Sequence, residues 1–180
     1  SELVAELLTY FDEKIELTRL EASALYAGIV VDTKNFAVQT GVRTFEAAAF
    51  LRRSGADPAL VRHLFRFDME TLKLRALILS SAEFIKGGVV LAICPFEVKN
   101  GQIIAAQSAD TMLNIEGVRV SFVLWPDDEG VGISARSNGE VNVQVIMEAF
   151  NGGGHHTVAG AHLAGVDVLE ASRRLEAVIV

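Results

Sequence analysis

The chain has 180 residues, about half of them apolar, and a formal net charge of −7. This length is enough for one large or two small domains, and the composition favours a packed globular core. An acidic surface repels the phosphate backbone of nucleic acids, which argues against a general DNA- or RNA-binding protein.

The charge is not spread evenly along the chain. Residues 43–75 hold seven basic and four acidic side chains, whereas residues 84–180 hold six basic and eleven acidic ones. A local cationic patch is therefore compatible with an acidic molecule, but we expect no stable DNA partner.

The cysteine content of the chain points to a reducing compartment. Cys94 is the only cysteine, so no intrachain disulfide forms, which fits the cytoplasm. It lies in the apolar run VVLAICPF, where a buried thiol is favoured over a reactive one.

No apolar run approaches the roughly 20 residues that span a bilayer, and no signal peptide is visible. We expect no membrane contact by this segment. The chain begins with Ser inside an expected helix, which predicts a piece of a larger protein.

The first part of the chain shows mainly helical patterns. Apolar residues recur at helical spacing in SELVAELLTYF and again from about Glu16 to Gly28. A short apolar run over residues 29–31 then ends on Asp32. Three further helices are predicted from their N-caps, which are Thr44, Asp57 followed by Pro58, and Asp68.

Near residue 84 the pattern changes to a mixture of strands and helices. FIKGGVVLAICPF is typical of two short strands around a Gly-Gly turn, and SADTMLNI of a helix. VRVSFVLW alternates at period two, so residues 117–137 are predicted to form a β-hairpin. VNVQVIMEAF and LEASRRLEAVIV are predicted helices on either side of a glycine loop. The change of pattern places a domain boundary near residues 55–83 and predicts an α/β fold.

The run NGGGHHTVAGAHL, residues 151–163, is the first candidate site. Glycines let a ligand approach backbone N–H groups closely, and successive N–H groups form an anion-binding nest. The small residues of VAGA allow close packing beneath that loop. His155 is placed to hydrogen-bond a phosphate oxygen or protonate a leaving oxygen, with His156 and His162 as weaker candidates. The alternative is a mobile connector, and His63 is expected on a helix surface.

Two charged side chains at the ends of apolar runs are further candidates. Arg136 in ISARS offers a guanidinium fork that matches a phosphate, with pairing to an acidic side chain as an equal alternative. Asp32 closes the run GIVVD, which is typical of a functional acid at the end of a strand but also of a helix cap. A divalent-metal site needs several ligands, and the sequence of residues 1–83 contains no dense Asp/His cluster.

The segments that contain Asp32, Arg136 and the glycine run, in this order along the chain, resemble the DHH phosphoesterase family with its C-terminal DHH-associated domain. The GGGH signature of that domain is matched by Gly152, Gly153, Gly154 and His155, and VAG follows as in the family. EASALYAGIVVDTKNFAVQTGVRTFEAAAFLRRSGADP is similar to the end of the catalytic DHH domain. Both this stretch and SFVLW followed by GISARSNGEVNVQVIMEAFNGGGH are similar to the bacterial branch that hydrolyses cyclic di-AMP. The resemblance covers nearly the whole chain.

The resemblance implies a helical tail of a DHH catalytic domain followed by a mixed-sheet α/β domain. Residues 1–55 correspond to the C-terminal part of the DHH domain, residues 56–83 to linker helices, and residues 84–180 to the substrate-binding DHH-associated domain. The substrate-binding residues that it implies are Arg136, Ser137, Gly152, Gly153, Gly154 and His155, with Asn142 as a weaker candidate.

In function, the resemblance implies a phosphodiesterase that hydrolyses cyclic di-AMP to pApA, or related short nucleotides, with Mn²⁺. Of the family's metal ligands only Asp32 is present, so no catalytic set is complete and the chain alone is expected to be inactive. The loop departs from this branch at Asn151 and His156, where Gly and Leu are usual. That departure leaves oligoribonucleotide or pAp-type substrates open. The full-length protein is expected in the cytoplasm, and many members of this branch carry an N-terminal membrane anchor. Formation of a homodimer is left open as an alternative.

Two alternatives come from other functional classes. Residues 84–180 suit an RNA- or nucleotide-binding module without catalysis, although their acidic charge opposes RNA binding. A structural or dimerisation domain with an idle glycine loop is the third hypothesis.

Overall fold

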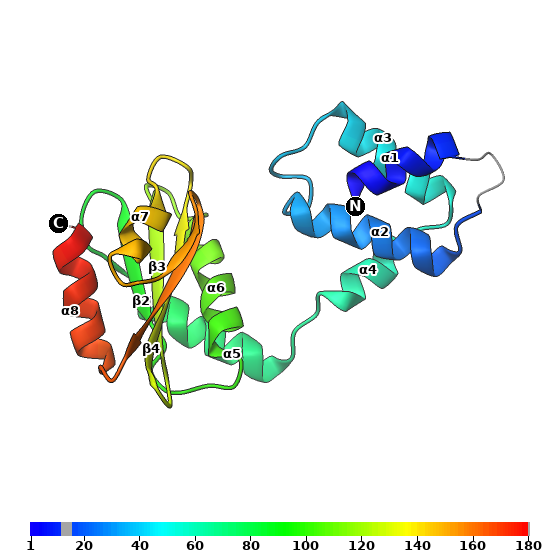
Figure 1. Ribbon diagram of the computed structural model, residues 1–180. Coiled ribbons are helices and arrows are strands. Elements are labelled where there is room, and N and C mark those ends of the chain that lie inside the picture. The colour runs from blue at the N-terminus through cyan, green and yellow to red at the C-terminus, as the bar shows by residue number, and fades with distance from the viewer. Residues whose placement is uncertain (12–15, 180) are drawn as a thin grey trace. The chain divides into compact units, whose positions relative to one another are not determined.

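A computed structural model describes residues 1–11 and 16–179, and the chain packs as two units, residues 1–67 and 68–180 (Figure 1). The division falls inside the segment 56–83 that we expected to connect the two parts. The first unit is helical, and the second holds a mixed sheet with helices on both faces. The mixed α/β fold expected from the sequence is therefore confirmed.

In residues 1–11 and 16–67, the first unit contains four helices around a small core. They are α1 (Glu2–Phe11), α2 (Arg19–Asp32), α3 (Val42–Arg53) and α4 (Pro58–Leu64). The buried apolar residues at its centre are mostly alanines, namely Ala5, Ala22, Ile29, Ala47, Leu51 and Ala56. Small side chains let the helices approach closely but bury little apolar area. Larger apolar side chains such as Leu7, Phe11 and Phe45 remain exposed.

Two local expectations in this unit are wrong. The run 29–31 continues α2, so Asp32 ends a helix and not a strand. β-Branched residues favour strands, but here Ile29 is buried in the helical core, and tertiary packing decides. Thr44 is the third residue of α3 and not its N-cap, which is Gly41. The Thr44 hydroxyl accepts the N–H of Gly41 at 3.1 Å.

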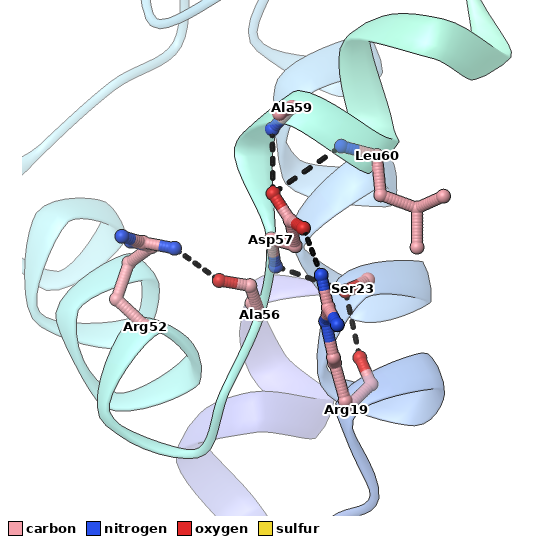
Figure 2. Close-up of polar contacts among 7 residues, drawn as sticks. All are labelled: Arg19, Ser23, Arg52, Ala56, Asp57, Ala59 and Leu60. Atoms are coloured by element: carbon pink, nitrogen blue, oxygen red, sulfur yellow. Dashed lines mark hydrogen bonds and ion pairs between the residues drawn. The ribbon is translucent and has the colours of Figure 1, made fainter.

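Asp57 joins α2 to α4 through several polar contacts, drawn in Figure 2. As predicted, it caps α4: its carboxylate accepts the N–H groups of Ala59 and Leu60 at 2.8 and 3.3 Å. The same carboxylate forms an ion pair with Arg19. The backbone N–H of Asp57 donates to Ser23 Oγ at 3.0 Å. The hydrogen bond from Arg19, followed by those from the helix N–H groups, lowers the pKa of Asp57.

The second unit surrounds a six-stranded sheet with four helices. The helices are α5 (Met69–Ser80), α6 (Gly101–Met112), α7 (Val143–Glu148) and α8 (Val168–Ile179). The strands are β1 (Glu83–Phe84), β2 (Val89–Ile93), β3 (Val120–Asp127), β4 (Gly130–Ser137), β5 (Gly153–His155) and β6 (Val158–Ala164). Their order in the sheet is β1-β2-β3-β4-β6-β5. The β2–β3 pair is parallel and is connected through α6, and the other pairs are antiparallel.

Several sequence predictions in this unit are confirmed. Asp68 caps α5, because its carboxylate accepts the N–H of Thr71 at 2.7 Å. The β1–β2 pair surrounds the Gly-Gly turn, and β3 and β4 form the expected hairpin. Cys94 is buried, and this burial raises the pKa of its thiol.

Within residues 1–11 and 16–179, no helix is long and apolar enough to cross a membrane.

Two hydrophobic cores lie on opposite faces of the sheet. Phe122, Leu124 and Ile133 pack on the face that α7 and α8 cover. Val90 and Val123 belong to the core on the other face, beneath α5 and α6. Figure 1 shows α8 and α6 on the two sides of the strands. Each strand therefore sends alternate side chains into different environments.

We expect Asp57→Ala to lower the melting temperature of the first unit, because it removes the α4 cap and the link to Arg19. Asp57→Asn keeps an acceptor for the cap but loses the ion pair. A carboxyl whose pKa is lowered on folding stabilises fully above its unfolded pKa, and this stabilisation is lost as pH falls through the folded pKa. The difference between wild type and Asp57→Asn should therefore shrink on acidification. Thermal unfolding followed by circular dichroism at several pH values measures it.

Asp68→Ala is the matched control, because it removes an N-cap from the second unit instead. The fluorescence of Trp125, the only tryptophan, follows that unit separately. An Asp57→Ala protein that melts like the wild type at neutral pH would contradict the structural role of this network.

Candidate functional site

A groove lies over the half of the sheet where small residues replace large ones. Gly132 and Ser134 of β4 and Gly160 of β6 lie on the face that also carries α6, and Ser134 pairs with Gly160. Because these residues have small side chains or none, they leave open space above the strands. Helix α6 borders this space on one side, and β5 borders it on the other. The resulting groove has a volume of about 920 Å³, within the range of ligand pockets.

Gly153, Gly154 and His155 of the GGGH run form the edge strand β5, so the run is not a mobile connector. In β5, Gly153 pairs with Gly160 and Gly154 with Ala159. A Cβ on Gly152 would lie 2.3 Å from the carbonyl oxygen of Gly160. Gly154 has a φ of +148°, and a Cβ there would lie 2.4 Å from a carbonyl oxygen of β6. The predicted close packing of VAGA beneath the glycines is thus present, and it requires glycine at two of the three positions.

His155 ends β5 beside this groove. Its side chain is exposed, and the residue lines the groove together with the three glycines. Because β5 is the last strand of the sheet, its outer side presents backbone N–H groups at an edge. Glycines without side chains leave such groups accessible to an anion.

Arg136 reaches the same groove from β4. Only 12% of its side chain is exposed. Its Nε donates to Asp110 Oδ2 of α6 at 3.4 Å, and its Nη1 donates to the carbonyl oxygen of Ala135 at 2.9 Å. A guanidinium has five N–H donors, and these two bonds use two of them. The pairing with an acidic side chain that the sequence left open is therefore present, and Arg136 also lines the groove. Its contact with a phosphate stays a prediction.

Three weaker candidates have contacts that stabilise turns and a helix end. The Ser137 hydroxyl accepts the N–H of Gly139 at 3.0 Å. Asn142 caps α7 by accepting the N–H of Gln144 at 3.0 Å. The Nε2 of His156 lies 2.9 Å from the carbonyl oxygen of Gly139. Residues Ser137, Asn142 and His156 do not belong to the lining of the groove.

The other end of the groove contains residues that the sequence analysis missed or ranked low. Trp125 and Asp127 from the end of β3 line it, as does His162 of β6. The Nε2 of His162 lies 2.9 and 3.0 Å from the two carboxylate oxygens of Asp127. This hydrogen bond is the largest cause of a lowered pKa of Asp127. The only sequence signal was a single tryptophan directly before the acidic turn PDDEG.

Asp32 belongs to the first unit and is not one of the residues that line this groove. It is exposed at the end of α2, in a shallow depression with Glu2 and Thr33. Over the described ranges 1–11 and 16–179, no three His, Cys, Asp or Glu side chains come together in a way that could hold a metal ion. The residues that the structure describes therefore do not fit a manganese site, and no catalytic step through a metal follows from them.

Known proteins with similar sequences place this groove in a recognised domain. The model of the DHHA1 domain matches residues 86–179. The cyclic-di-AMP phosphodiesterase GdpP of Geobacillus thermodenitrificans is 48% identical over 180 residues, which cover 99% of this chain and 27% of that protein. The cyclic-di-AMP phosphodiesterase PdeA of Listeria monocytogenes is 46% identical over 97% of this chain and 27% of its own length. The chain thus spans about a quarter of the length of these curated relatives.

A solved structure shares the fold. An exopolyphosphatase-related protein from Bacteroides fragilis matches with a TM-score of 0.87 and 23% sequence identity. The match covers 99% of this chain and 55% of that one. At this identity the comparison supports the architecture and carries no inference about ligands.

We expect Gly152→Ala and Gly154→Ala to destabilise the second unit by about 1–3 kcal/mol, because each added methyl group would overlap β6. Gly153→Ala is the matched control, since a Cβ there meets nothing within 4 Å. Urea denaturation followed by Trp125 fluorescence measures all three variants. Equal stability of the three proteins would contradict the β5 geometry and favour a mobile connector.

Proposed function

Because this chain belongs to the DHHA1 domain family, we propose that its second unit binds cyclic di-AMP, or the linear product pApA, as part of a phosphodiesterase. The observation that supports this proposal best is the groove itself, which brings Arg136 of β4 together with the glycines and His155 of the GGGH run. The names of the relatives, both cyclic-di-AMP phosphodiesterases, indicate the class of substrate.

The phosphate is proposed to lie at the Arg136 end of the groove. Arg136 supplies a charge that is largely shielded from water, and a charge–phosphate hydrogen bond is stronger in such a setting than on an open surface. His155 and the backbone N–H groups at the edge of β5 add further hydrogen-bond donors for an anion. The contact between Arg136 Nε and Asp110 Oδ2 is long, at 3.4 Å. We therefore expect a phosphate oxygen to compete with Asp110 for the guanidinium.

The first unit is proposed to belong to a larger catalytic domain. Its small alanine-rich core leaves large apolar side chains of α1 and α3 exposed, among them Leu7, Phe11 and Phe45. Exposed apolar groups of this kind support packing against further protein. Asp32 would contribute to a Mn²⁺ site there only together with ligands beyond the residues described here. We also propose that the full-length protein is anchored to a membrane.

A second candidate is a nucleotide-binding module without catalysis. It is favoured by one specific observation: among the described residues, a groove suited to a nucleotide is formed while no group of three metal ligands is. The two candidates agree on binding and differ on turnover, so they are separated by assays of a longer protein.

We expect calorimetric titration to show binding of cyclic di-AMP and pApA to this chain. Arg136→Ala and His155→Ala each remove a phosphate donor, so each should weaken binding about tenfold to a hundredfold. His156→Ala is the matched control, because this neighbouring exposed histidine does not line the groove and should leave the affinity unchanged. Titration of pAp in parallel ranks the alternative substrate. Absence of binding by the wild-type chain, or equal losses in all three variants, would overturn the proposal.

Hydrolysis of cyclic di-AMP by this 180-residue chain with Mn²⁺ is expected to be negligible. A phosphodiester develops additional negative charge during attack, and the described residues offer no grouped ligands for the cations that would offset it. The measurement is formation of pApA over time, with a longer protein that carries the Asp/His motifs of the DHH domain as positive control. Robust turnover by the chain alone would show that the catalytic set lies within it.

A further inference from the structure

Asp110 contacts the arginine of the groove but does not itself line the groove. It belongs to α6, and its Oδ2 atom lies 3.4 Å from Nε of Arg136. The Asp110 side chain is 37% exposed, whereas only 12% of the Arg136 side chain is exposed. Because Asp110 is absent from the groove lining, a ligand in the groove senses its charge without touching it.

Contacts on both sides of this aspartate fix its position. Ser121 of β3 pairs with Arg136 across the sheet, and its hydroxyl donates to the carbonyl oxygen of Ala109 at 2.8 Å. Both Ser121 and Ala109 are fully buried. On the other side, Arg75 of α5 donates through Nη2 to the Thr111 hydroxyl at 2.8 Å. The backbone of the aspartate is therefore held between β3 and α5, which keeps its carboxylate within reach of the guanidinium.

A fixed negative charge beside the guanidinium lowers the positive potential in the groove. Among the described residues of the lining, Arg136 is the only lysine or arginine, so the attraction for an anion depends mainly on this side chain. The electrostatic energy of a ligand is its charge multiplied by the local potential. The free energy that Asp110 subtracts from binding is therefore twice as large for an anion with two negative charges as for an anion with one.

Hydrolysis of a phosphodiester changes the charge of the ligand in this way. Each phosphodiester group of cyclic di-AMP carries a single negative charge. When the oxygen of water bonds to one phosphorus, a P–O bond to a ribose oxygen breaks and that oxygen takes up one proton of the water. The other proton is released as the new terminal phosphate of pApA ionises, which leaves it with roughly two negative charges at neutral pH. An arginine without a neighbouring carboxylate would consequently favour the product over the substrate.

We propose that Asp110 is a positioning residue that reduces the preference of the groove for the product, so that pApA is released and cyclic di-AMP competes for Arg136. The inference rests on the proposed function and deepens it, because it concerns the balance between substrate and product at the same site. Asp110 acts through its charge, so a neutral side chain of the same shape removes the effect.

The experiment compares two ligands that differ only in phosphate charge, AMP and the 5′-methyl ester of AMP. At about pH 8 the phosphate of AMP carries roughly two negative charges, since its second pKa is about 6, and the ester carries about one. Calorimetry measures both affinities for the 180-residue chain and for Asp110→Asn. Loss of the carboxylate should strengthen binding of the ester about threefold and of AMP about tenfold, because the gain in free energy doubles with the charge.

Two further variants test whether charge is the cause. Asp110→Glu keeps the charge and should bind both ligands as the wild type does. Glu116→Gln is the matched control, because it removes a negative charge from an exposed residue of the same unit outside the groove lining, and it should leave both affinities unchanged. If Asp110 only oriented Arg136, Asp110→Asn would weaken both ligands or change both by the same factor, and either result would overturn the inference.

The wild-type chain supplies a second measurement that needs no variant. Partial neutralisation of Arg136 predicts that AMP binds less than about tenfold more tightly than its methyl ester. A larger preference for AMP would overturn the inference even if Asp110→Asn fails to fold, which circular dichroism checks.

The outcomes separate this inference from the function on which it rests. Binding of both ligands that Arg136→Ala weakens, with equal changes for the two ligands in Asp110→Asn, would overturn the role of Asp110 and leave the phosphate site standing. Absence of binding by both ligands, in the wild type and in Asp110→Asn, would overturn both. A larger gain for AMP than for the ester in Asp110→Asn, absent in Asp110→Glu, would support both.

Discussion

The strict alternation of side chains along β4 is the constraint on which the groove depends. Ile133 and Ala135 point into the core beneath α7 and α8, and both are fully buried. Gly132, Ser134 and Arg136 consequently point to the opposite face. A slip of one residue would place Ile133 in the groove and a glycine in the core. Burial of Ile133 and Ala135 in the core therefore places Arg136 on the face of the sheet that carries the groove.

The same register brings together residues from distant parts of the chain. Antiparallel pairing of β3, β4 and β6 sets Trp125, Gly132 and His162 in one row across the sheet. A second row, two pairs further along β4, joins Ser134 to Gly160 and then to Gly153 of β5. Among the described residues that line the groove, Arg136 is the only lysine or arginine, so the electrostatic attraction for an anion is concentrated there. Site geometry and charge pattern thus follow from the sheet.

Local signals allowed much of the fold to be predicted from the sequence. The caps at Asp57 and Asp68 act on the next turn of their own helices, so the sequence is sufficient to find them. The β3–β4 hairpin follows from alternation and a turn. The predictions of a strand end at Asp32 and of an N-cap at Thr44 were wrong. Burial of Ile29 keeps the run before Asp32 in α2, and Gly41 provides the N-cap of α3.

The candidate site was predictable only in part. The GGGH run and Arg136 were recognised from chemistry and from resemblance, and the structure places both in one groove. That the glycines form an edge strand was missed, since three consecutive glycines favour no strand by propensity. Trp125 and Asp127 were missed as site residues because their contribution depends on cross-strand register, which a single sequence does not display.

The two departures from the family's loop pattern lie on either side of β5. Asn151 follows α7 with a φ of +56°, a left-handed conformation that asparagine and glycine both adopt, so the exchange preserves the turn. His156 approaches the carbonyl oxygen of Gly139 and does not line the groove. Asn151, in contrast, lines the groove beside Gly152. Of the two positions, only Asn151 is therefore placed to affect what binds there.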